Sequence, residues 1–142
     1  TNQQLNKDYI IAVAKNKEKI EQKQKIEAQL ASIKKSVDTR VEKHISSIGA
    51  PKIWDVGENV RNLQKTLKTL WYFKVSDTAI FGETTQKSLL KYQLDKGIIS
   101  SHSADGAWVF GPKTKESIKS ELAIILETQL LKEKDLLSYK NK

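Results

Sequence analysis

The chain has 142 residues and a net charge of +8, from 25 Lys and Arg against 17 Asp and Glu. This length suggests one domain with an appendage, or two very small units, and no apolar run approaches the ~20 residues of a membrane-spanning helix. The absence of cysteine excludes disulfides, thiolate metal ligands and a cysteine nucleophile from this sequence.

Residues 1–48 contain neither Gly nor Pro and predict one long helix, from about residue 5 to 47. Its apolar residues recur every three or four positions and form a coiled-coil-like stripe with a stutter: Ile26, Leu30, Ile33, Val37, Val41, Ile45 and Ile48. Such a stripe needs a partner helix, in a second copy or in this chain. We expect the half nearer the following domain to pack within the chain. Gly49 and Pro51 are typical helix-ending residues, so the domain boundary is placed here.

Three shorter helices are predicted beyond this boundary. The apolar spacing predicts the first over residues 58–70, and the second runs from the turn at Gly82 to about Lys96. The third begins at Pro112, and no helix breaker occurs before the chain end, so it is expected to reach about Leu137. Its apolar stripe is the candidate partner for the long helix: Ile118, Leu122, Ile125 and Leu126, continued by Leu130 or Leu131.

One motif occurs twice, 29 residues apart, as Phe81-Gly82-Glu83-Thr84-Thr85 and Phe110-Gly111-Pro112-Lys113-Thr114. Each copy places an aromatic residue before a Gly turn and a helix start, and each follows an Asp, at Asp77 and Asp105. The repeat predicts two similar loop-to-helix corners whose Phe side chains fill the core. The predicted centre of that core is Leu63, Leu67, Phe81, Leu89, Phe110 and Ile118.

The ordered set of motifs resembles the small three-helix peptidoglycan-binding domain that accompanies many cell-wall hydrolases. The matching residues are Gly57, Val60, Leu63-Gln64, Leu67 and Leu70, then Asp77, Phe81-Gly82 and Thr85, then Tyr92-Gln93 and Gly97-Ile98, then Asp105-Gly106 and the Phe110–Thr114 motif. The resemblance implies an all-α fold: a three-helix module over residues 50–122, preceded by the long helix of residues 1–48. Residues 123–142 extend the last helix.

The resemblance implies non-catalytic binding of bacterial peptidoglycan, which would anchor or target a larger exported protein to the wall. The expected location is extracytoplasmic, in the cell envelope or secreted. No catalytic residue, metal or cofactor is predicted, because the two histidines, His44 and His102, fall in different units without metal-ligand spacing. The alternative is a structural or assembly module, in which the long helix binds a protein partner or a second copy. No nucleic-acid partner is predicted, since the positive charge is spread along the chain.

Ligand contacts are predicted at the mouth between the end of the first short helix and the two Phe-Gly corners, where loops sit on a rigid helical frame. The candidate residues are Trp71, Tyr72, Asp77, Gln93, Asp105 and Trp108. For three of them a structural role is equally consistent with the sequence. Gln93 could bond backbone at a helix end, and Asp77 and Asp105 could bond backbone amides in their turns.

Overall fold

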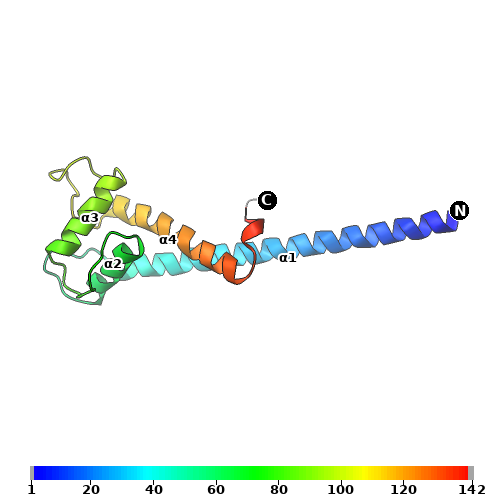
Figure 1. Ribbon diagram of the computed structural model, residues 1–142, viewed down its shortest axis with the longest axis horizontal. Helices are drawn as coiled ribbons and strands as arrows, with labels where there is room; N and C mark the ends of the chain where they lie inside the picture. The colour runs from blue at the N-terminus through cyan, green and yellow to red at the C-terminus, as the bar shows by residue number, and fades with distance from the viewer. Residues whose placement is uncertain (1, 141–142) are drawn as a thin grey trace. The chain divides into compact units, whose positions relative to one another are not determined.

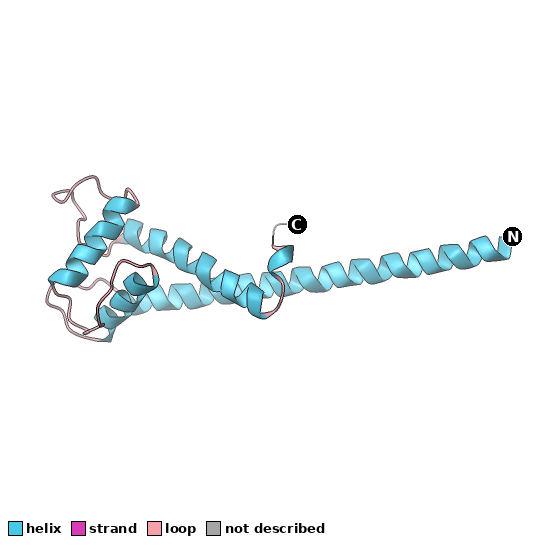
Figure 2. Ribbon diagram, in the orientation of Figure 1, coloured by secondary structure: helices cyan, strands magenta, loops and turns pink. Residues whose placement is uncertain are grey.

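The computed structural model describes residues 2–140, and the predicted all-α fold is confirmed within them (Figures 1 and 2). The helices are α1 (Asn2–Ile48), α2 (Glu58–Thr69), α3 (Glu83–Asp95), α4 (Pro112–Glu133) and the 3-10 helix η1 (Leu137–Tyr139). Among the described residues, none of these helices combines the length and the hydrophobicity needed to cross a membrane.

The chain forms two compact units. One holds residues 38–124, and the other combines the first 37 residues with the chain after residue 124. The last three turns of α1 thus belong with α2, α3 and the first half of α4. Gly49 ends α1 with a φ of +64°, as its position after the apolar stripe predicts.

The core of the 38–124 unit contains every residue that the sequence predicted for it. All six of these side chains are at most 1% exposed: Leu63, Leu67, Phe81, Leu89, Phe110 and Ile118. Tyr92 is fully buried beside them, and its hydroxyl bonds Ser117 and Glu121 at 2.7 Å each. A buried tyrosine ordinarily needs such partners, so α3 and α4 are joined by polar as well as apolar contacts.

Polar contacts attach the end of α1 to α2. The Thr66 hydroxyl donates to the Asn62 carbonyl at 2.7 Å, so the bond of 2.7 Å between His44 Nε2 and Thr66 Oγ1 is donated by the histidine. The Asn59 side chain bonds the Ile48 carbonyl at 3.3 Å and so satisfies one of the last carbonyl groups of the helix. Burial lowers the pKa of His44 from its ordinary value, which favours the neutral ring in the folded chain.

In the second compact unit, the stripe of α1 packs within the chain, as predicted for its half nearer the domain. Ile26, Ile33 and Val37 are buried in the unit that also buries Leu131 and Leu136. The large apolar side chains nearer the N-terminus are all at least 49% exposed: Leu5, Tyr9, Ile10, Ile11, Val13 and Ile20.

The end of α4 differs from the sequence prediction, because the helix stops at Glu133 rather than near Leu137. Asp135 takes the left-handed conformation, with a φ of +55°. The Leu136 amide then donates to the Leu131 carbonyl at 2.7 Å, the six-to-one bond of a Schellman motif. Burial of both leucines stabilises this turn, so an Asp occupies the position where glycine usually signals a helix end.

The burial of His44 predicts a loss of stability in mild acid. As the pH falls below 6.5, the unfolded chain binds a proton at His44 while the folded chain resists it, so the free energy of unfolding decreases until the lowered folded pKa is passed. Urea titrations between about pH 7 and pH 5 measure this decrease. His44→Gln should remove it, whereas the matched change at the exposed His102 should leave it in place. Equal pH dependence in both variants would contradict the assignment.

Candidate functional site

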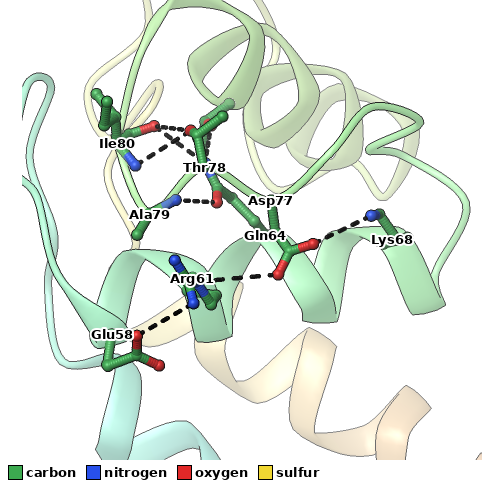
Figure 3. Close-up of polar contacts among 9 residues, drawn as sticks. Glu58, Arg61, Gln64, Lys68, Asp77, Thr78, Ala79 and Ile80 are labelled. Atoms are coloured by element: carbon green, nitrogen blue, oxygen red, sulfur yellow. Dashed lines mark hydrogen bonds and ion pairs between the residues drawn. The ribbon is translucent and has the colours of Figure 1, made fainter.

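A buried glutamine organises the first Phe-Gly corner. Gln64 is fully buried, and its Oε1 accepts a hydrogen bond from the Ala79 amide at 3.0 Å (Figure 3). Its Nε2 donates to the Ile80 carbonyl and to Thr85 Oγ1, both at 3.0 Å. One side chain on α2 thereby fixes both the loop and the first turn of α3.

The second corner repeats this arrangement 29 residues later. The fully buried Gln93 accepts a bond from the Trp108 amide at 2.9 Å and donates to the Val109 carbonyl at 2.9 Å and to Thr114 Oγ1 at 3.1 Å. Gln93 was a predicted ligand contact, but its amide nitrogen and oxygen are both used inside the fold. The backbone groups that Gln93 bonds lie in the loop before α4 rather than at the end of its own helix.

The residue that each glutamine oxygen binds has a left-handed backbone. Ala79 has a φ of +65° and Trp108 a φ of +64°. Ala79 is buried, whereas the Trp108 side chain is 39% exposed. The second corner therefore holds a large aromatic side chain at the surface where the first corner has a methyl group.

Trp71 occupies a left-handed position of another kind, at the end of α2. The Tyr72 amide donates to the Leu67 carbonyl at 2.8 Å, and the Trp71 amide donates to the Lys68 carbonyl at 3.0 Å. These bonds define a Schellman motif, whose left-handed residue is usually glycine. The same motif ends α3 with Gly97, at a φ of +69°, whereas Trp71 has a φ of +70° and is 81% exposed.

Trp54, which was not among the residues predicted from the sequence, is a third exposed tryptophan with a left-handed backbone. It is 65% exposed, it has a φ of +73°, and its amide donates to the Phe81 carbonyl at 2.7 Å. All three tryptophans of the chain thus lie in loops with positive φ and with exposed side chains. Positive φ is a genuine outlier for a bulky residue, and such outliers cluster at ligand-binding sites.

Two hollows that share a wall lie beside Trp54 and Trp71. Trp54 lines a hollow of about 390 Å³, and Trp71 lines one of about 850 Å³. Both are lined by Phe73, Val75 and Ser76, so the two hollows adjoin along this segment. We call the adjoining hollows the Trp54–Trp71 groove.

Trp108 lines a different hollow, of about 540 Å³, beside α3. Its other walls include Leu90, Leu94 and His102, together with two lysines of α3. The predicted contacts Trp71 and Trp108 thus line two different hollows rather than one mouth.

The three remaining predicted residues have different surroundings. The Tyr72 hydroxyl donates to Asp95 at 2.9 Å, and its pKa is raised by burial and by this carboxylate. Asp77 pairs with Lys68 at 3.4 Å (Figure 3), and its pKa is lowered by a hydrogen bond to its own backbone amide and by this lysine. Asp105 is exposed. Among residues 2–140, no three His, Asp or Glu side chains are grouped so that they could hold a metal ion.

Comparison with known families places a match on the first of the two corners. Residues 56–101 match the model of a family described as "Putative peptidoglycan binding domain". The resemblance inferred from the motifs is confirmed. The match covers α2, the first corner and α3, and it ends before the second corner. No curated protein and no solved structure matched the chain.

Replacing Trp71 by glycine is predicted to stabilise the fold. A left-handed backbone costs a non-glycine residue about 1–2 kcal/mol, and the greater freedom of glycine in the unfolded chain offsets about 0.5–1 kcal/mol of this. Because the Trp71 side chain is 81% exposed, little packing is lost. We expect Tm to rise by about 2–4 °C in calorimetry.

The matched control is Gly97→Ala, at the same position of the same motif in α3. A Cβ at Gly97 meets no atom within 4 Å, so only its φ of +69° opposes the substitution, and Tm should fall. A Trp71→Gly chain that melts below the wild type would show that the indole contributes more to packing than its exposure indicates.

Proposed function

We propose that this chain binds bacterial peptidoglycan without catalysing its cleavage, through the module predicted over residues 50–122. The observation that carries the proposal is the family match over residues 56–101. The structure adds exposed aromatic side chains on a helical frame that two buried glutamines fix. Concave surfaces with aromatic walls and a few polar groups are the usual form of a saccharide or peptide site.

Of the ligand contacts predicted from the sequence, we retain Trp71, Tyr72, Asp77, Asp105 and Trp108. Gln93 is left out, because it is fully buried and its amide is used in the second corner. Trp71 and Trp108 are the strongest members, since they expose apolar area beside lysines that suit the carboxylates of peptidoglycan.

The proposed biological role is to hold a larger exported protein against the cell wall, in the envelope or outside the cell. This role follows from the ligand, since peptidoglycan is an extracytoplasmic polymer. The net charge of +8 supports it, because a positive chain is attracted to a polymer that carries carboxylates.

The proposal is tested by co-sedimentation of the full chain with purified sacculi. We expect saturable binding that weakens as salt increases, because charge contributes to it, and no release of soluble wall fragments. Insoluble cellulose serves as the control polymer, since it lacks both carboxylates and acetamido groups. Equal retention on cellulose would contradict specific recognition, and release of fragments would contradict a non-catalytic role.

A second function, in assembly, is favoured by the exposed apolar residues of α1. Tyr9, Ile10 and Ile11 are each more than 50% exposed on a helix that carries no Pro or Gly. We propose that this end of α1 contacts another helix, in a second copy or in a partner protein. Light scattering of the full chain should show concentration-dependent association, and Ile10→Lys should weaken it. A strict monomer at all concentrations would leave a partner protein as the occupant.

A further inference from the structure

We infer that the Trp54–Trp71 groove binds the glycan strand of peptidoglycan, with one sugar ring stacked on each indole. This inference rests on the proposed function and names the site and the part of the polymer that it binds. Trp54 was not among the residues predicted from the sequence, and it lies outside the family match, which begins at residue 56.

The left-handed backbone at Trp54 and Trp71 indicates that these indoles do not serve the stability of the fold. Trp71 stands where the equivalent helix end of α3 uses Gly97, and both have nearly the same φ. Trp54 has a φ of +73°, and its side chain is 65% exposed. Each position thus combines a conformation that disfavours a side chain with the largest side chain available, directed at solvent. Burial of these faces by a ligand would offset the cost of the strained backbone.

The groove between the indoles offers both apolar groups and hydroxyl groups, and an N-acetylated sugar carries the same two kinds of group. Phe73 and Val75 form its shared wall and suit acetamido methyl groups. Ser76, Thr78 and Thr84 line the Trp54 end, and their hydroxyls can donate to and accept from sugar hydroxyls and acetamido groups. A flat indole face covers the apolar C–H face of a pyranose ring and loses little conformational entropy in doing so.

Two lysines at the Trp71 end of the groove suit a glycan that carries carboxylates. Lys68 and Lys74 line this end of the groove beside Trp71. The Lys68 ammonium lies 3.4 Å from Asp77 and 6.0 Å from the centre of the Phe73 ring, which holds it at the wall of the groove. Where the stem peptides have been removed, the lactyl groups of a peptidoglycan strand carry a free carboxylate on alternate sugars, whereas a chitin strand has none.

The backbone at the Trp54 end is unsuited to a peptide that binds as an added strand, because such binding needs open backbone groups. The Ala79 amide is bonded to Gln64 and its carbonyl accepts from the Gly57 amide at 2.9 Å. The Ile80 carbonyl is bonded to Gln64, and its amide donates to Thr78 Oγ1 at 3.2 Å. A stem peptide therefore cannot bind along Ala79 and Ile80 as an added strand, and we assign the groove to the glycan.

The experiment uses the full chain and soluble glycan strands from which an amidase has removed the stem peptides. The three indole N–H signals of the wild-type chain are followed by NMR during titration, so that no substitution is needed to detect the site. We expect the Trp54 and Trp71 signals to shift together, with a single affinity. Chitin oligosaccharides of equal length should bind more weakly, because they lack the carboxylates.

Three variants then measure how much the indoles contribute to strand binding. Each variant places glycine at a left-handed position, so that folding is preserved. Trp54→Gly and Trp71→Gly should each weaken strand binding by about tenfold, as is typical of the loss of a stacked aromatic anchor. Asp135→Gly, at a left-handed position outside the groove and outside the proposed contacts, is the matched control and should stay within about twofold of the wild type. Melting curves confirm that each variant is folded.

The outcomes separate this inference from the proposed function. If the wild type binds sacculi but not stripped strands, or if only the Trp108 signal shifts, the groove assignment is wrong and wall binding stands. If the chain binds stripped strands through Trp54 and Trp71 but not sacculi, the groove is correct and wall binding is wrong. If the chain binds neither sacculi nor strands, both are overturned.

Discussion

The hydrogen bonds of the buried glutamine amides are the constraint on which the geometry of the 38–124 unit depends. Gln64 and Gln93 each join a helix to the loop that follows it and to the first turn of the next helix. An amide left without partners in this interior would cost about 1–3 kcal/mol, so each loop has one favourable path across the core. Because Phe81 and Phe110 lie two residues after the bonded backbone amides, the same constraint directs both rings inward.

These fixed corners allow tryptophans to occupy conformations that an isolated loop would abandon. A loop with free backbone groups would relax a residue out of the left-handed region, whereas the Trp108 amide is bonded to Gln93 and the Trp71 amide closes a helix end. The surrounding structure therefore determines the left-handed conformation of these tryptophans. The free-energy cost of that conformation is offset by the stability of the whole unit. A surface made in this way has a rigid, exposed aromatic face at the expense of stability.

The sequence predicted those parts of the fold that depend on periodicity and on Gly or Pro. These signals predicted the apolar stripe of α1, the burial of Phe110 and the motif that recurs after 29 residues. The end of α4 was missed because Asp135 adopts a conformation that sequence assigns to glycine. Trp54 was missed because it lies in a loop without periodicity, outside the family motif. Gln93 was visible as half of a motif, but its partners are distant in sequence, so its role required the structure.

The exposure of the three tryptophans also determines where oxidants would modify this chain. Cysteine and methionine are the residues that oxidants usually attack first, and the sequence contains neither. The indoles of Trp54, Trp71 and Trp108 are then the most oxidisable side chains, and all are open to solvent. None of them belongs to the buried hydrophobic core, which is formed by aliphatic residues, Phe and Tyr92. Oxidative damage would therefore alter the surface of the protein while its folded framework persists.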